Sequence, residues 1–182
     1  MPALRPAVFL DRDGVINRTF TRDGVSVPPP TVEEFAFLPG VVEACQRLHS
    51  AGFPLVVVTN QPDVARGMTT RERVEELHAI VRQNLPILDV MVCCHDNADN
   101  CDCRKPKPGL LLQSAQRWNL DLARSFMVGD RHSDVLAGQA AGCRTILVVT
   151  PFSKADRCQP DHCAADLAAA VEWILHQPLR GE

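Results

Sequence analysis

Short, continuous apolar runs recur along this chain, and stretches of helical length separate them. The runs occupy residues 7–10, 55–58, 89–92, 126–128 and 145–149. Continuous apolar runs are typical of strands that are covered on both faces of a sheet. Helical patterns occupy residues 41–51, a stretch that opens at residue 69, and residues 110–118, 133–141 and 164–176. The alternation predicts an α/β fold, a three-layer sandwich with a central parallel sheet.

The length suits one domain. At 182 residues the chain can form one full hydrophobic core, and it shows neither an internal repeat nor a long linker. We therefore expect a single domain over residues 1–182. Residues 19–30, which include three consecutive prolines, and residues 151–163 are expected to be exposed loops. The interval between Asp13 and Thr59 has room for one loop and one helix, so no large cap domain is expected.

The composition argues against several classes of protein. With a net charge of −3 and no basic stripe, the chain lacks the positive surface that is typical of nucleic-acid binders. No apolar run approaches the ~20 residues of a membrane-spanning helix, and no cleavable leader is visible at the start. We expect a cytoplasmic monomer without nucleic-acid or membrane partners.

Polar and charged side chains follow the apolar runs. In chain order they are Asp11, Asp13, Thr59, Asn60, Arg104, Lys105 and Asp130. Parallel α/β sheets bind their ligands beyond the carboxyl ends of the strands, so we expect these side chains to surround one site.

The aspartates indicate a magnesium site and a nucleophile. Asp11 and Asp13 alone are a weak signal, because such pairs are common in turns. Asp130 at the same edge of the sheet would repel them strongly unless a cation lay among the three. Carboxylate oxygens with room for water suit Mg²⁺, which also screens a phosphate from an anionic nucleophile. We predict that Asp11 attacks phosphorus to form a phospho-aspartate and that Asp13 is the general acid and base.

The other residues at this edge suit phosphoryl transfer. Thr59 can offer its hydroxyl and Asn60 its backbone N–H to phosphoryl oxygens, and Lys105 can neutralise charge that develops there. The planar fork of Arg104 can bind a phosphate or a polar arm of the substrate. Asp134 either supports the metal site or is a carboxylate that stabilises a helix N-terminus.

Cysteines cluster in one short segment. Cys93, His95, Cys101 and Cys103 form a C-x-H-x5-C-x-C pattern, a Cys3His set that is typical of tetrahedral zinc. The alternative is a group of buried cysteines without metal. Cys94 could replace Cys93, although it is adjacent to His95, which makes chelation by both awkward. Four protein ligands would complete the zinc shell, so we predict a structural zinc that fixes this loop.

Four motifs, VFLDRDGVIN, VVVTNQ, CDCRKPKPG and MVGDRHSD, occur in this order between residues 7 and 150. They resemble the motifs of the haloacid dehalogenase (HAD) superfamily, and more narrowly those of its histidinol-phosphatase-like group. The resemblance implies a Rossmann-like, HAD-like fold with Asp11 as nucleophile and Asp13 as acid and base. It also implies that Asp11, Asp130 and the carbonyl oxygen of Asp13 hold magnesium.

The same resemblance assigns roles to three basic residues. Lys105 would stabilise the phosphate, and Arg104 and Arg131 would contact the substrate. Residues 65–67 (ARG) and 107–112 (KPGLLL) resemble the branch that removes the 7-phosphate of D-glycero-D-manno-heptose 1,7-bisphosphate. We therefore predict a phosphatase of carbohydrate metabolism that acts on a small sugar bisphosphate.

Other functions stay open at this point. The five residues between His95 and Cys101 resemble the shorter zinc loop of histidinol-phosphate phosphatases. A polynucleotide end phosphatase is disfavoured by the net charge of −3. A zinc-stabilised binding module without catalysis is disfavoured by the complete set of acidic residues. For the second phosphate of a bisphosphate, Arg104, Arg131 and Lys107 are the cations that we expect.

Overall fold

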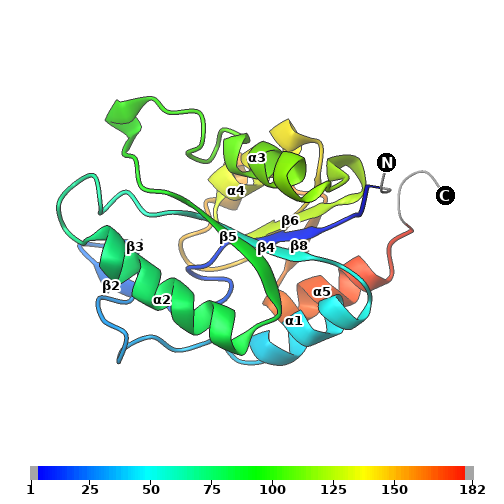
Figure 1. Ribbon diagram of the computed structural model, residues 1–182, viewed down its shortest axis with the longest axis horizontal. Helices are drawn as coiled ribbons and strands as arrows, with labels where there is room; N and C mark the ends of the chain where they lie inside the picture. Colours follow the sequence, from blue (N-terminus) through cyan, green and yellow to red (C-terminus); the bar gives the residue numbers. More distant parts are fainter. Residues whose placement is uncertain (1–3, 179–182) are drawn as a thin grey trace.

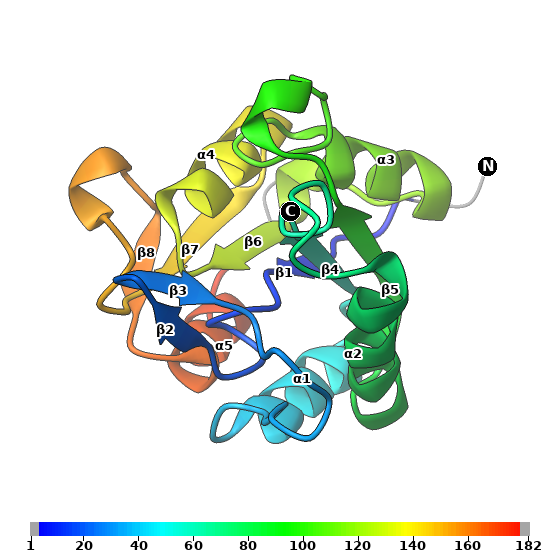
Figure 2. The same ribbon diagram turned by 90° about the vertical axis from the view of Figure 1, so that its left-hand side faces the viewer.

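The computed structural model describes residues 4–178 and has a six-stranded parallel sheet at its centre (Figures 1 and 2). The strands lie in the order β5-β4-β1-β6-β7-β8, and every neighbouring pair is parallel. They are β1 (Val8–Leu10), β4 (Leu55–Asn60), β5 (Ile87–Cys93), β6 (Phe126–Gly129), β7 (Arg144–Val148) and β8 (His162–Ala164). The predicted central sheet is confirmed, with β8 as an additional edge strand.

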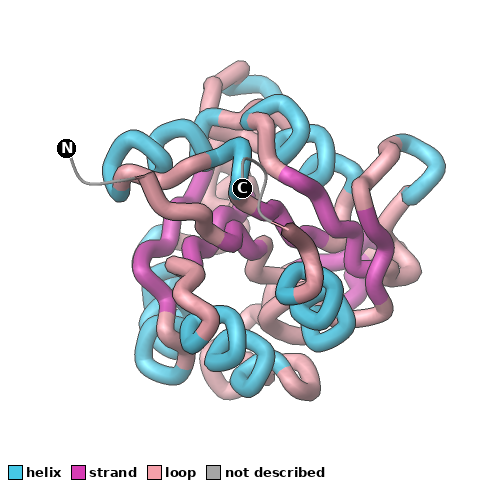
Figure 3. The backbone as a smooth tube through the Cα atoms, turned by 90° about the vertical axis from the view of Figure 1, so that its right-hand side faces the viewer, coloured by secondary structure: helices cyan, strands magenta, loops and turns pink. Residues whose placement is uncertain are grey.

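Helices cover both faces of the sheet (Figures 1 and 3). They are α1 (Val41–Ser50), α2 (Arg71–Asn84), α3 (Gly109–Trp118), α4 (His132–Ala141) and α5 (Leu167–Leu175). α1, α2 and α5 lie on one face, and α3 and α4 lie on the other, which confirms the three-layer sandwich. Within residues 4–178, no helix combines the length and the apolar character that crossing a bilayer requires.

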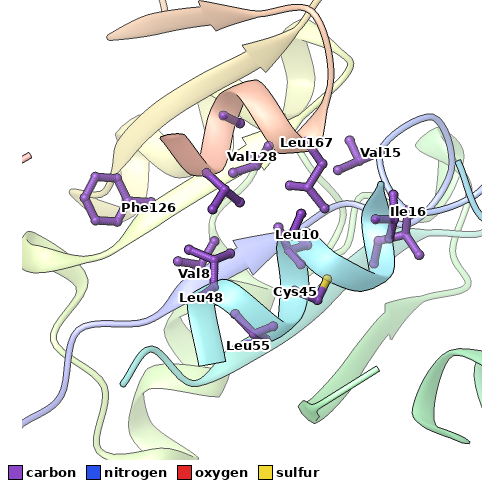
Figure 4. Packing of buried hydrophobic residues seen from close by; sticks show 14 of the residues in the cluster. Val8, Leu10, Val15, Ile16, Cys45, Leu48, Leu55, Phe126, Val128 and Leu167 are labelled. Carbon is purple, nitrogen blue, oxygen red and sulfur yellow. The ribbon is translucent and has the colours of Figure 1, made fainter. Parts of the chain in front are cut away.

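The side chains of β1 alternate between the two layers. Val8 and Leu10 belong to the hydrophobic cluster that includes α1 and α5 (Figure 4), whereas Phe9 belongs to the cluster that includes α3 and α4. All three side chains are fully buried, and the burial of each contributes about 1.5–3 kcal/mol. β1 is therefore a rigid support for Asp11, which follows it directly.

Residues 19–30, which were predicted to be an exposed loop, instead contain a β-hairpin. Its strands are β2 (Phe20–Arg22) and β3 (Val25–Val27), which pair in antiparallel fashion. Asp23 and Gly24 form the turn with φ angles of 52° and 72°, as a tight two-residue hairpin turn requires. Strands of three residues are too short to show a period of two in the sequence.

The chain after β7 also differs from the prediction. Residues 151–163, expected to be a loop, include the 3-10 helix η3 (Ala155–Arg157) and the start of β8. α5 begins at Leu167 and not at Ala164, because Ala164 is part of β8 and Asp166 caps the helix. Two more 3-10 helices are η1 (Asn97–Asp99) and η2 (Leu122–Arg124).

Candidate active site

A cavity of about 470 Å³ lies at the carboxyl ends of the central strands. The chain runs from β1 to β4 on one side and later returns to β6 on the other, which is the place where such sheets bind ligands. Figure 2 shows the hairpin of β2 and β3, the loop after β4 and the loop between β5 and α3 around this end of the sheet. The cavity is lined by residues 11, 13, 25–28, 59–63, 66, 97, 104–106 and 131–134.

Lys105 joins two aspartates at this cavity. Its Nζ donates to Asp11 Oδ1 (2.8 Å) and to the carbonyl oxygen of Val58 (2.7 Å), and it lies 2.6 Å from Asp134 Oδ1. These three partners match the three donors of an ammonium group. Burial alone would lower the pKa of Lys105, but the negative charges of Asp11 and Asp134 more than offset burial and raise that pKa. The lysine is therefore positively charged beside Asp11.

Asp11, Asp130 and Asp134 form a group that could hold a metal ion. One oxygen of each lies within 4.8 Å of the others, and all three residues are buried. Burial, together with repulsion from Asp11 and Asp134, raises the pKa of Asp130 to about 8. Asp130 Oδ1 has no hydrogen-bond partner among the described residues, and Arg131 Nε is 4.0 Å away. A buried carboxylate oxygen that lies near other negative charges and accepts no hydrogen bond is well suited to bind a cation.

Two glycines allow the carboxylates to approach one another. Gly14 has a φ of 88°, and a Cβ at this residue would lie 2.5 Å from Asp130 Oδ2. A Cβ on Gly129 would lie 2.1 Å from the Cβ of Asp134. Any side chain at either glycine would therefore displace a carboxylate from the group.

Asp13 lies at the cavity but outside this group. Its carboxylate accepts hydrogen bonds from Arg12 Nη2 (2.9 Å), Asn17 Nδ2 (2.9 Å) and Gln61 Nε2 (2.7 Å). Burial alone would raise the pKa of Asp13, but the charge of Arg12 and these hydrogen bonds lower it below its usual range. None of these three partners was predicted from the sequence, although the charge of Arg12 directly beside Asp13 was a visible signal.

Asp13 thus lines the same cavity as Asp11, as expected, but its carboxylate is not one of the three that could hold a metal ion. Asp134 is the third carboxylate of that group. Asp134 also caps α4: its Oδ2 accepts a hydrogen bond from the backbone N–H of Arg131 (2.9 Å). Asp134 therefore has contacts that support both roles considered for it. It lies in the group that could hold a metal ion, and it stabilises the N-terminus of α4.

Thr59 and Asn60 lie at the end of β4, as expected. The Thr59 hydroxyl accepts a hydrogen bond from Gln61 Nε2 (2.9 Å), so its own proton remains available to a ligand. The side chain of Asn60 pairs with the backbone of Lys105: Nδ2 donates to its carbonyl oxygen (3.0 Å), and Oδ1 accepts from its N–H (3.2 Å). Asn60 therefore fixes the loop that carries Lys105, a role that the sequence did not indicate.

The structure brings the four predicted cysteine and histidine ligands together. Cys93, His95, Cys101 and Cys103 each place a ligand atom within 4.8 Å of the other three, a group that could hold a metal ion. The sulfur–sulfur distances within it are 3.2, 3.5 and 3.7 Å, too long for a disulfide bond of about 2.05 Å. Cys94 is buried next to this group but does not belong to it.

The predicted cations divide into two sets. Arg104 and Arg131 line the cavity; Arg104 Nε donates to Asn97 Oδ1 (2.8 Å), and Arg131 Nη2 donates to the carbonyl oxygen of Ser26 (3.0 Å). Lys107 is not among the lining residues, because its Nζ contacts Asn100 and Asp102 on the exposed side of its loop.

Arg66 also lines the cavity, whereas Lys107, which was expected to bind the second phosphate, does not. Its guanidinium donates to both oxygens of Asp96 at 2.8 and 2.7 Å, so it joins the loop after β4 to the loop between β5 and α3. In the sequence, Arg66 was only part of the ARG motif. Its contact with Asp96 depends on two loops that are distant in the chain.

Residues 102–170 match the family model described as HAD-hydrolase-like. The fold and the site thus define a hydrolase of the haloacid dehalogenase class. The chain is 34% identical to the D-glycero-beta-D-manno-heptose-1,7-bisphosphate 7-phosphatase of Yersinia pestis, over 94% of this chain and 90% of that protein. It is 37% identical to the corresponding phosphatase of Thermosynechococcus vestitus, over 93% and 95% of the two chains.

A solved structure supports the same family assignment. The crystal structure of D,D-heptose 1,7-bisphosphate phosphatase from B. bronchiseptica, complexed with magnesium and phosphate, aligns with a TM-score of 0.80 and 31% identity. The alignment covers 95% of this chain and 99% of that chain. The chain therefore belongs to the heptose bisphosphate phosphatase family of the HAD-like hydrolases, and the resemblance seen in its motifs is confirmed.

Proposed function

We propose that this protein hydrolyses phosphomonoesters through a phospho-aspartate at Asp11. The observation that carries this proposal is the contact of Lys105 Nζ with Asp11 Oδ1 (2.8 Å) at a cavity lined by aspartates and arginines. The lysine orients the carboxylate and places a positive charge where the phosphoryl group would be transferred. The family's named phosphatases support the same reaction.

The reaction proceeds in two halves. Asp11 first attacks phosphorus, the bond from phosphorus to the ester oxygen breaks, and the leaving oxygen takes a proton from Asp13. Water then attacks the phosphorus of the phospho-aspartate, gives a proton to Asp13, and releases inorganic phosphate and the free Asp11 carboxylate. The contacts of Asp13 with Arg12 and Gln61 stabilise its carboxylate form, which is the form that accepts this proton.

Three neighbouring groups would bind the phosphoryl oxygens during both halves. Thr59 would donate its hydroxyl proton, Asn60 its backbone N–H, and Lys105 its charge. Asn60 also fixes the backbone of Lys105 through two hydrogen bonds. We therefore expect Thr59, Asn60 and Lys105 to keep the same positions relative to one another in both halves of the reaction.

We propose that Mg²⁺ binds at the carboxylate group, with Asp11, Asp130 and the carbonyl oxygen of Asp13 as protein ligands. The residues fit such an ion, since Asp130 Oδ1 is buried without a partner in the described chain. The relative that is complexed with magnesium and phosphate supports this choice of metal. When bound, the ion would neutralise the crowded carboxylates and the phosphate.

Chelation should test this assignment. We expect EDTA to abolish phosphate release and added Mg²⁺ to restore it, because hard carboxylate oxygens with room for water suit Mg²⁺. Zn²⁺ should not restore activity. Phosphate release is measured with the chelator in excess and then after each metal is added back. Full turnover in excess EDTA would contradict the magnesium site.

We further propose that Zn²⁺ binds Cys93, His95, Cys101 and Cys103. The sulfur–sulfur distances of 3.2 to 3.7 Å are close to the edge of about 3.8 Å in a tetrahedron with ~2.3 Å zinc–sulfur bonds. Four protein ligands leave no open position, so the ion would stabilise structure and take no part in the chemistry. Lys105 follows the last ligand by two positions, so the ion would fix the loop that carries it.

For the substrate, we propose D-glycero-D-manno-heptose 1,7-bisphosphate, hydrolysed at the 7-phosphate. The names of the relatives support this choice. Arg104 and Arg131 at the cavity could bind the second phosphate, and they would repel the cationic amine of histidinol phosphate. The short zinc loop is the one feature that favours histidinol phosphate.

The heptose bisphosphate should therefore have a higher kcat/KM than histidinol phosphate, by about tenfold or more, because one charge-assisted contact is worth ~1.5–3 kcal/mol. Phosphate release from both substrates at equal enzyme concentration measures this ratio. A kcat/KM for histidinol phosphate equal to or above that for the bisphosphate would contradict the proposed substrate.

Arg104→Ala tests the proposed contact with the second phosphate. It should reduce kcat/KM more for the bisphosphate than for a heptose monophosphate. Lys107→Ala is the matched control, because it removes a nearby cation that does not line the cavity. Equal losses for both substrates in Arg104→Ala would assign Arg104 another role.

A further inference from the structure

Arg66 lines the cavity, and each nitrogen of its guanidinium faces a carboxylate. Its Nε and Nη2 donate to the two oxygens of Asp96 at 2.8 and 2.7 Å, the bidentate geometry in which arginine binds a carboxylate most firmly. Its Nη1 lies 3.4 Å from Asp63 Oδ1 in the same loop. The charge of Arg66 is therefore already paired, and its main partner belongs to the loop between β5 and α3.

Asp96 is the residue at which η1 begins. Its Oδ1 also accepts a hydrogen bond from the backbone N–H of Asn97 (2.7 Å), and its own N–H donates to Asp99 Oδ2 (2.7 Å), so that the two aspartates form a capping box. η1 contains no buried residue, so burial contributes little to holding this turn in place. The position of η1 depends on polar contacts, and the pair of Asp96 with Arg66 ties it to the loop after β4.

Asn97 connects η1 to Arg104, and both residues line the cavity. The Oδ1 of Asn97 accepts a hydrogen bond from Arg104 Nε (2.8 Å), and the carbonyl oxygen of His95 accepts another from Arg104 Nη1 (3.2 Å). His95 belongs to the proposed zinc group, which fixes one side of the guanidinium. The contact on the other side holds only while η1 keeps its place, which Arg66 secures through Asp96.

We propose that Arg66 is a positioning residue for binding the second phosphate of the substrate: by holding Asp96, and with it η1, it keeps the guanidinium of Arg104 at the cavity. The inference rests on the phosphatase function proposed above, and it names a residue on which the preference for a bisphosphate depends. A loosened η1 weakens the contact with the second phosphate and leaves the reaction at Asp11 unchanged. Arg66 should therefore affect KM for a bisphosphate and not kcat.

Arg66→Ala should raise KM for the heptose bisphosphate by about threefold to fivefold, the size of effect that one partly exposed ion pair supports. Its kcat should stay within about twofold of the wild-type value. KM for the corresponding heptose 7-phosphate, which lacks the second phosphate, should hardly change. Steady-state phosphate release measures kcat and KM for both substrates. Arg71→Ala is the matched control, because it removes an exposed arginine at the start of α2 that does not line the cavity, and it should alter none of these constants.

The double variant Arg66→Ala/Arg104→Ala separates positioning from direct binding. If Arg66 acts through Arg104, its removal has no further effect once Arg104 is absent, so the double variant should have the KM of Arg104→Ala. Thermal melting monitors the fold of each variant, and partial unfolding would lower kcat for both substrates instead of raising one KM. Increases in KM that multiply in the double variant, no increase in Arg66→Ala, or an equal increase for the 7-phosphate would overturn the proposal. A wild-type protein that releases no phosphate from the bisphosphate would contradict the proposed function itself.

Discussion

Asp11→Asn is expected to lower kcat/KM by at least about a thousandfold, because an amide cannot form the acyl phosphate. The fold should persist, since the amide oxygen can still accept the hydrogen bond that Lys105 donates to Asp11 Oδ1. Phosphate release with saturating Mg²⁺ measures the loss of activity, and circular dichroism measures the fold.

The same variant should be at least as thermostable as the wild type when both are free of magnesium. Burial raises the pKa of Asp11 from 3.8 to about 6, although Lys105 opposes this shift. Ionised Asp11 therefore destabilises the folded state above about pH 6, and this cost disappears as the pH falls toward 4. The advantage of Asp11→Asn in Tm should be largest near neutral pH and should shrink toward pH 4.

Asp23→Asn is a matched control for both measurements. It makes the same change at the exposed turn of the hairpin, where asparagine tolerates the positive φ of 52°. It should keep wild-type activity and a wild-type dependence of Tm on pH. More than trace activity in Asp11→Asn would show that another group attacks phosphorus.

The positions of several site residues followed from the sequence for a simple physical reason. In a parallel sheet the carboxyl ends of neighbouring strands meet at one edge, so residues directly after an apolar run must lie close together. Asp11 follows β1, Thr59 is the next-to-last residue of β4 and Asp130 follows β6, and the three strands are neighbours. The gathering of Cys93, His95, Cys101 and Cys103 followed from their spacing alone, because they lie within one short segment of the chain.

Side-chain partners could not be predicted in the same way. The orientation of Asp13 depends on Gln61, which β4 brings from a distant part of the chain. The contact of Asp134 with Lys105 depends on Gly129, since a Cβ there would displace Asp134. These contacts are set by packing between elements, and no local pattern in the sequence encodes them.

The hairpin of β2 and β3 differs from these side-chain contacts, because the sequence contained a local signal for its turn. Asp23-Gly24 is a typical two-residue turn, yet the three prolines that follow favoured a loop. Val25 to Val27 shows that a short strand can form beside such a run when the turn fixes its register. Here turn chemistry was a better guide than apolar periodicity.

Removing one zinc ligand should have the largest effect on stability. We expect wild-type protein to hold about one zinc ion per chain, and Cys103→Ser to lose it. Folding and zinc binding are coupled, and structural zinc contributes ~10–16 kcal/mol in small zinc-finger peptides, so a loss of roughly 3 kcal/mol or more is expected in this larger fold. Elemental analysis measures the zinc, and urea unfolding measures the stability.

Loss of zinc should also reduce activity, although the four proposed ligands do not line the cavity. Lys105 follows Cys103 by two positions, and its Nζ must reach Asp11 Oδ1 at 2.8 Å. A loop without its ion would hold this contact less well. The kcat/KM of Cys103→Ser should therefore fall by at least about tenfold, because small displacements of catalytic groups cause losses of this size.

Cys94→Ser is the matched control: it makes the same change in the same loop, at a buried cysteine outside the metal group. It should keep the zinc and nearly all of the activity. If Cys103→Ser were as stable and as active as Cys94→Ser, and the wild type held no zinc, the four residues would be a cluster of thiols and an imidazole without a metal.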